Sequence, residues 1–307
     1  MRPGPMIRPS RRVIEPMAQK PRQSSRRLWL SIHRWLGLAV GLVLALIGLS
    51  GTILAMKGPI LRWELGAAAY EVTPQSGPML SEAQWKVAAT RAYPQFQRVM
   101  GAAPPHGGFF DSPNATVFGQ VAGRQRAMAV ALVDPRTGAP RRFFVYDDLA
   151  IAKVVALHRS LLLPPPIGGP VLALLGLILF TSTATGLWLW WPFGGQWRQR
   201  LFPSLRRIAR LRLIEWHRLA GAWVALPMLL LAGTGVWLAA PRLWASLFGE
   251  VRRGAAGARG PSVVANLHAN LLLGPVGQVL VGLSGVVLTL LVVTGLWQWW
   301  ARSRRRS

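Results

Sequence analysis

The chain has 307 residues, 51% of them hydrophobic, with no Cys, five His and a formal charge of +26. The absence of Cys excludes disulfide scaffolds, thiol catalysis and Cys-based zinc clusters. Four uncharged runs, at 35–56, 160–191, 219–240 and 260–301, each reach the roughly 20 residues that a helix needs to cross a bilayer. The chain is therefore an integral membrane protein with lipid around it, and we expect no nucleic acid as a partner for its charge.

In chain order, the sequence predicts nine segments. They are a basic tail (1–31), a first span (32–56), an outer insertion (57–157), a second span with a preceding interfacial segment (158–191), a basic loop (192–216), a third span (217–240), an outer loop (241–267), a fourth span with a preceding interfacial segment (268–300) and a basic tail (301–307).

Charge placement predicts the orientation of these spans. The first tail, the loop at 192–216 and the last tail hold eight, six and four Lys or Arg, whereas 57–157 and 241–267 are much less basic per residue. Cytoplasmic loops are enriched in Lys and Arg, and Trp prefers the headgroup layer, where we place Trp188 and Trp297. We therefore expect both termini in the cytoplasm and the two outer segments on the other side of the membrane.

A cleavable or twin-arginine signal is the alternative for the N-terminus, because Arg26 and Arg27 precede the first apolar run. That run is longer than the apolar region of a signal, and Ile53 interrupts the small-residue pattern before Ala55. We expect a retained span.

The spans also form an internal repeat. The first span aligns with the third without a gap, and the matches are His33 with His217, Gly37 with Gly221, and Ser50-Gly51 with Thr234-Gly235. The second aligns with the fourth with one residue of slippage, and the matches are His158 with His268 and Thr185-Gly186-Leu187-Trp188 with Thr294-Gly295-Leu296-Trp297. The predicted fold is an all-α membrane protein: a four-helix transmembrane bundle of two parallel two-helix repeats, related by an axis along the membrane normal, with a small α+β insertion.

Four of the five histidines occupy equivalent repeat positions. His33 and His217 should face each other near the inner surface, and His158 and His268 near the outer surface. A six-coordinate b-type haem needs two neutral imidazoles across the porphyrin, and this symmetry supplies that arrangement twice. The sequence therefore predicts two haem b groups, with His33, His217, His158 and His268 as the iron ligands.

Other interpretations of these histidines remain open. Each His alone could be an interfacial residue beside a snorkelling Arg such as Arg34. Two imidazoles without a nearby carboxylate leave zinc or non-haem iron short of ligands. A transporter would need polar or broken elements at the midplane, where the first and third spans offer little beyond Ser50 and Thr234.

The outer insertion reads as a small α+β domain between Lys57 and about Val145. Ser81 is a plausible N-cap of a helix that runs to Ala92. Residues 127–133 indicate a strand, which enters a turn at Asp134-Pro135-Arg136-Thr137-Gly138. His106 lies in a Pro- and Gly-rich stretch that we expect to be a solvated loop, with a substrate or metal contact as the minor alternative.

The chain resembles the PepSY-associated transmembrane helix family, the iron-regulated inner-membrane proteins that include ferric-siderophore reductases. The resemblance covers about residues 28–300 and is carried by His33-Arg34-Trp35-Leu36-Gly37, Val133-Asp134-Pro135-Arg136-Thr137-Gly138, Leu157-His158-Arg159-Ser160-Leu161, Thr185-Gly186-Leu187-Trp188, His217-Arg218 and Leu267-His268. The Pro164-Pro165-Pro166 run and the short, poorly patterned insertion depart from the family pattern, so substrate contacts cannot be carried over.

The resemblance implies an inner-membrane protein that holds two haems by paired His and passes electrons to ferric siderophores or other ferric chelates in the periplasm. The chain lacks a dinucleotide fingerprint, so electrons should come from a cytoplasmic flavoprotein or a membrane quinol. The alternative is a haem-free PepSY-type interaction or regulatory protein. Oligomeric state, haem potentials and the identities of substrate and donor do not follow from the sequence.

Overall fold

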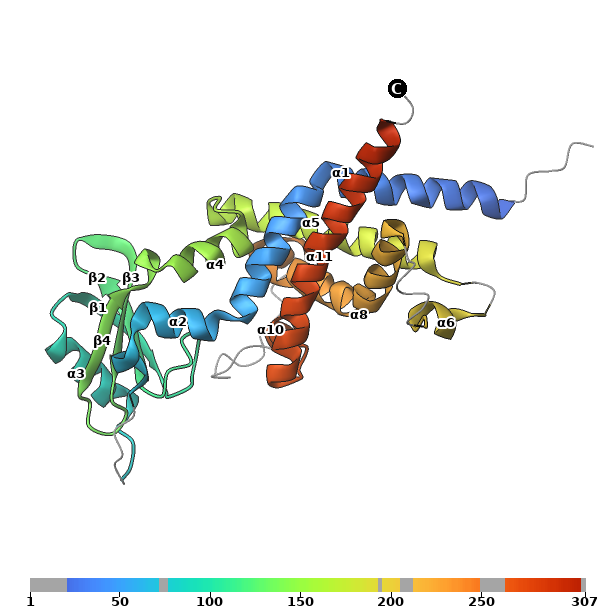
Figure 1. Ribbon diagram of the computed structural model, residues 1–307. Coiled ribbons are helices and arrows are strands. Elements are labelled where there is room, and N and C mark those ends of the chain that lie inside the picture. Colours follow the sequence, from blue (N-terminus) through green and yellow to red (C-terminus); the bar gives the residue numbers. More distant parts are fainter. Residues whose placement is uncertain (1–20, 72–76, 193–194, 205–211, 249–262, 305–307) are drawn as a thin grey trace, which may run out of the picture.

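The computed structural model describes residues 21–71, 77–192, 195–204, 212–248 and 263–304 (Figure 1). Much of the predicted N-terminal tail, part of the basic inner loop, residues 249–262 of the outer loop and the last three residues lie outside the described residues. Four described helices are long and apolar enough to cross a membrane: α1 (Pro21–Ala55), α5 (Pro165–Trp190), α8 (Leu213–Ala239) and α11 (Gly274–Ser303). The chain is a multi-pass membrane protein.

The four spans pack as a closed bundle. The most extensive contacts are between α1 and α11 and between α5 and α8, and contacts of α1 with α5 and of α8 with α11 complete the ring. Glycine permits the close approaches, because a Cβ on Gly285 would overlap the carbonyl oxygen of Gly48, and one on Gly176 would lie 2.7 Å from Val236 Cγ2. In lipid, such contacts between backbones replace the hydrophobic effect as the main source of helix association.

Two short helices precede the second and fourth spans. The helix α4 (Ala150–Ser160) lies against α1 and α5, and α10 (Val263–Asn270) lies against α8 and α11. Each is followed by a sharp reversal in which two leucines have positive φ, namely 55° and 61° at Leu161 and Leu162 and 52° and 60° at Leu271 and Leu272. A left-handed conformation costs a non-glycine residue about 1–2 kcal/mol, so the bundle must hold these turns in place.

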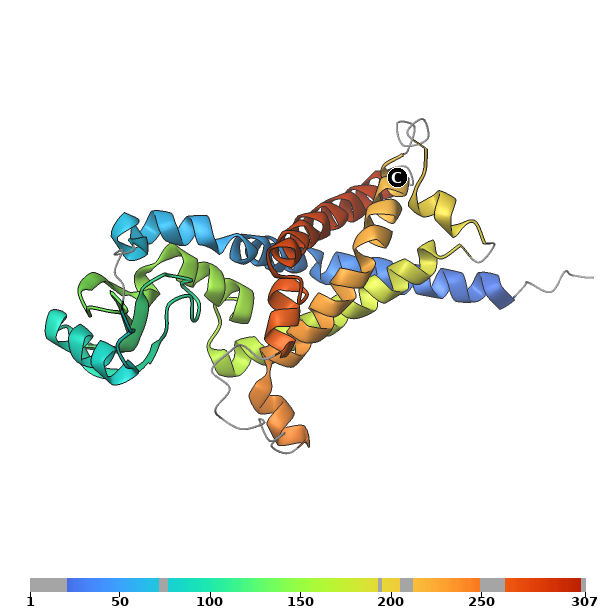
Figure 2. The ribbon, with the colours of Figure 1, turned by 90° about the horizontal axis from the view of Figure 1, so that it is seen from below.

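The described residues also form several smaller helices. They are α2 (Lys57–Leu65), the 3-10 turns η1 (Ala67–Tyr70) and η2 (Tyr146–Asp148), α3 (Glu82–Ala92), α6 (Trp197–Leu201) and α9 (Pro241–Phe248). Of these, α2, η1, α3 and η2 belong to the insertion, which lies at one end of the bundle (Figures 1 and 2).

The insertion contains a four-stranded antiparallel sheet in the order β1-β2-β3-β4, formed by β1 (Phe96–Ala103), β2 (Ala115–Val121), β3 (Arg124–Val133) and β4 (Pro140–Val145). Both faces of the sheet are buried. Ala129 and Ala131 of β3 join a core with Trp85 of α3, whereas Val130 and Leu132 point to a second core formed with α2 and α4. Because successive strand residues face opposite sides, a strand covered twice is apolar throughout.

The local predictions for this insertion are confirmed. The helix α3 begins after Ser81, whose side chain accepts a hydrogen bond from the Gln84 backbone N–H, while Gln84 accepts one from the Ser81 backbone N–H. The strand predicted at 127–133 is part of β3 and is followed by the turn that starts at Asp134.

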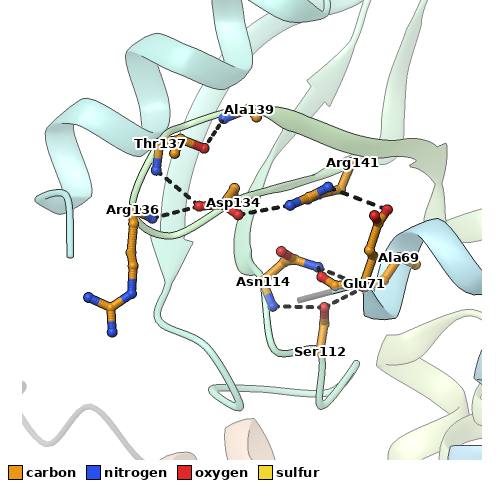
Figure 3. A network of polar contacts seen from close by, with 9 residues as sticks. All are labelled: Ala69, Glu71, Ser112, Asn114, Asp134, Arg136, Thr137, Ala139 and Arg141. Carbon is orange, nitrogen blue, oxygen red and sulfur yellow. Dashed lines mark hydrogen bonds and ion pairs between the residues drawn. The ribbon is translucent and has the colours of Figure 1, made fainter. Parts of the chain in front are cut away.

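The Asp134 carboxylate connects the β3–β4 turn to the rest of the insertion (Figure 3). One oxygen accepts hydrogen bonds from the backbone N–H groups of Arg136 and Thr137, and the other binds the Arg141 guanidinium at 2.9 Å. Arg141 also pairs with Glu71 at 3.4 Å, next to η1. Since the Asp134 side chain is only 4% exposed, this ion pair is largely removed from water.

We expect Asp134→Ala to destabilise the insertion by about 2 to 4 kcal/mol, because it leaves a shielded guanidinium without its buried partner. Asp148→Ala is the matched control, since Asp148 pairs with Arg124 where both side chains are more than half exposed. That change should have little effect. Thermal unfolding, monitored by limited proteolysis of the insertion, would measure the stability of both variants. Equal loss of stability in the two variants would contradict the role given to Asp134.

Candidate functional site: two histidine pairs

The structure brings the four repeat-equivalent histidines together as two pairs. His33 on α1 and His217 on α8 have ring centres 6.4 Å apart, with ring planes at 82° to each other. His158 on α4 and His268 on α10 have ring centres 6.2 Å apart, with planes at 47°. Each pair therefore joins a residue from the first half of the chain to the equivalent residue from the second half.

These spacings suit a metal ion between two imidazoles. A metal–nitrogen bond to His is about 2 Å long, so two bonds in line, together with the distance from each nitrogen to its ring centre, span about 6 Å. Within the described residues, no three His, Asp or Glu side chains gather as a metal site. Two protein ligands per site fit haem iron, for which the porphyrin supplies the other four.

In each of the four paired histidines, Nδ1 already has a hydrogen-bond partner. His33 Nδ1 lies 2.9 Å from the Ser182 carbonyl oxygen, and His158 Nδ1 lies 3.1 Å from the Ile47 carbonyl oxygen. His217 and His268 place Nδ1 at 2.8 and 2.9 Å from the hydroxyls of Thr294 and Thr234. A carbonyl can only accept, so Nδ1 carries the proton in His33 and His158, and Nε2 keeps the lone pair that a metal requires.

The outer pair lies deeper than its short helices suggest. His158 and His268 reach Ser50 and Thr234, each five residues before the end of its span at Ala55 or Ala239. At 1.5 Å per residue, the contact is about 7 Å inside the helix end. The sequence placed an interfacial segment before each of these spans, but it did not give the depth of the histidine side chains.

A family model matches most of the chain. The model of the PepSY-associated TM region matches residues 30–265 and 260–307. The chain belongs to the PepSY-associated TM region family. A search of curated proteins found no match. Membership confirms the family resemblance seen in the sequence, and the four candidate ligands of this PepSY-associated protein lie within the matched residues.

The fifth histidine of this PepSY-associated protein stands apart. His106 lies in an exposed loop outside the bundle, and its Nδ1 is 3.2 Å from Asp111, whose side chain is also exposed. The prediction of a solvated loop is confirmed.

The glycines of the first and third spans differ in what surrounds them. A Cβ on Gly37, one turn after His33, would meet nothing within 4 Å, and one on Gly221, one turn after His217, would touch only Leu291 at 3.9 Å. Gly48 instead packs against α11. The two repeat-equivalent glycines thus both have open space beside them, one turn after the inner histidines.

Sequence reasoning missed Glu64. Its carboxylate on α2 accepts hydrogen bonds from the backbone N–H groups of Ala150 and Ile151, at 2.6 and 3.3 Å, at the start of α4. Because Leu149 at the N-cap has no side-chain hydrogen bond, Glu64 caps the helix that carries His158. No local pattern signals this contact, which joins residues 86 positions apart.

Proposed function

We propose that the protein is a di-haem b electron-transfer protein of the bacterial inner membrane that reduces ferric siderophores or other ferric chelates on the periplasmic side. His33 and His217 would hold the inner haem, and His158 and His268 the outer one. The observation that carries the proposal is the spacing of 6.4 and 6.2 Å in two pairs whose Nδ1 atoms all have other partners. Haem, when bound, supplies one-electron transfer.

The two pairs lie at opposite ends of the bundle, as transfer across a membrane requires. Both His33 and Ser50, which contacts His158, belong to α1 and are 17 residues apart, or about 25 Å along the helix. His217 and Thr234 have the same separation on α8. This distance is slightly less than the roughly 30 Å of the hydrocarbon layer.

Two parallel two-helix repeats account for the contacts. Exchanging α1 with α8 and α5 with α11 turns the α1–α11 contact into the α8–α5 contact, and the α4 packing into the α10 packing. Each histidine also contacts a hydroxyl residue of its own half while facing a histidine of the other half.

The ferric chelate and the electron donor rest on the family resemblance and the topology. The insertion caps α4 through Glu64, so a periplasmic acceptor bound near the insertion would be close to the outer pair. On the cytoplasmic side, a flavoprotein or a membrane quinol would supply the electrons. The basic tails and loop favour this orientation.

Reporter fusions test the topology. Alkaline phosphatase joined after residue 120 should be active, and the same enzyme joined after residue 200 should be inactive, because only the first lies in the periplasm. A reporter that folds in the cytoplasm should give the reverse. Phosphatase activity at residue 200 would overturn the orientation.

Histidine substitutions test the ligands. The purified protein should show low-spin b-type spectra and about two haems per chain. His33→Ala and His217→Ala should each remove one haem, His158→Ala and His268→Ala should each remove the other, and His106→Ala should retain both. Retention of both haems in all four bundle variants would refute the assignment, and a wild-type protein without haem would leave the interaction or regulatory function.

Stopped-flow reoxidation tests the substrate class. Chemically reduced protein mixed with a ferric siderophore should lose its reduced haem spectrum and yield about one Fe(II), captured by a ferrous chelator, for each electron lost. His268→Ala should slow this reaction and leave chemical reduction of the inner haem intact. Haems that stay reduced with every ferric chelate, yet reoxidise with another acceptor, would rule out ferric reduction and retain electron transfer.

A further inference from the structure

Every histidine of the two pairs rests on the same small motif, a hydroxyl residue followed by glycine. The contacts join His33 to Thr185-Gly186, His158 to Ser50-Gly51, His217 to Thr294-Gly295 and His268 to Thr234-Gly235. The Nδ1–Oγ distances are 3.3, 3.1, 2.8 and 2.9 Å in the same order. Four histidines and four motifs are thus matched one to one.

The hydroxyl protons in these motifs are already committed. Thr185, Thr234 and Thr294 each donate to the carbonyl oxygen four residues earlier in their own helix, at 2.8, 2.6 and 2.8 Å. Ser50 donates to the carbonyl oxygen of Ile47 at 2.9 Å. A hydroxyl has one proton, so an oxygen that keeps this bond to its helix carbonyl can only accept from the imidazole. With these bonds in place, we infer the Nδ1–H tautomer for His217 and His268 as well as for His33 and His158.

The glycines provide room for the rings. A Cβ would lie 3.0 Å from the imidazole Cε1 at Gly51 and Gly186, 3.2 Å at Gly235 and 3.6 Å at Gly295. The first three distances are tighter than ordinary carbon contacts, so a methyl group would push the ring away. This differs from Gly48 and Gly285, where the missing side chains let two helices meet. At the four motifs, the close neighbour is a histidine side chain.

We propose that the four Ser/Thr-Gly pairs are positioning residues, which fix the tautomer and the rotation of each imidazole so that Nε2 faces the opposite histidine. The consequence for haem rests on the proposed function; the tautomer does not. The hydroxyl accepts a hydrogen bond from Nδ1–H, and the glycine lets the Cε1 edge of the ring approach the helix backbone. Without the hydroxyl, Nδ1 of His33 and of His158 would have a backbone carbonyl as its remaining partner, and the ring would be held less firmly.

Nitrogen NMR of the haem-free protein, labelled at histidine, tests the tautomer directly. All four bundle histidines should be neutral and carry the proton on Nδ1. Thr294→Val keeps the shape of the side chain and removes the acceptor, so part of the His217 signal should shift to the Nε2–H form. Thr294→Ser should restore it. Thr183→Val is the matched control, because Thr183 lies on α5, donates to the Leu179 carbonyl oxygen and has no histidine contact among its hydrogen bonds.

Haem binding tests the functional consequence. Loss of a group that orients a metal ligand typically costs 10-fold to 100-fold in affinity, so Thr294→Val should speed dissociation of the inner haem by about that factor, with Thr183→Val unchanged. Gly186→Ala should change the electron paramagnetic resonance signal of the inner ferric haem, which depends on the angle between imidazole planes, much more than Gly295→Ala.

The outcomes separate the two proposals. Wild-type tautomers and wild-type haem dissociation in Thr294→Val would overturn the positioning role, whatever the protein reduces. Equal effects of Gly186→Ala and Gly295→Ala would overturn the part given to glycine. A protein without haem whose Thr294→Val variant still shifts the His217 tautomer would refute the proposed function and support the positioning role.

Discussion

An imidazole inside a lipid-embedded bundle must find partners for both ring nitrogens, and this requirement organises the protein. Helix backbones satisfy most of their own hydrogen bonds, and among the described residues the acceptors that reach these rings are hydroxyls and the carbonyls three residues before them. His158 uses both kinds, Ser50 Oγ and the Ile47 carbonyl oxygen, each at 3.1 Å. The packing of α4 and α10 against the spans, and the leucine turns that follow them, bring His158 and His268 within reach of these acceptors.

The outer pair needs additional helices and turns to place its two rings inside the bundle. A transmembrane helix alone could carry His33 or His217, but His158 and His268 arrive on separate helices that enter the bundle from its end. The chain must then turn back at once into the next span, and the two left-handed leucines in each turn supply that reversal. In the first half, the Glu64 carboxylate joins the insertion to the start of α4, the helix that carries His158.

The sequence predicted what depends on periodicity and repetition. Spans, short helices, the Ser81 cap and the strand near 127–133 followed from local patterns, and the repeat aligned Ser50-Gly51 with Thr234-Gly235 before any contact was known. The contact of these dipeptides with the histidines did not follow from the sequence, because it depends on which helices face each other. The sheet was poorly patterned for a related reason: β3 is buried on both faces, and the alternation that identifies a strand is lost.

The inner and outer histidine pairs are not copies of each other, because the sequence repeat aligns the two members within each pair. The ring planes meet at 82° in the inner pair and at 47° in the outer pair. The outer pair combines one serine and one threonine, whereas the inner pair has two threonines. Only the first half carries the insertion. The repeat thus relates the two halves of a site, and the inner site is free to differ from the outer one in ring angle and in hydrogen-bond acceptors. Glu64, which joins the insertion to the start of α4, adds to this difference because it caps a helix of the outer pair alone.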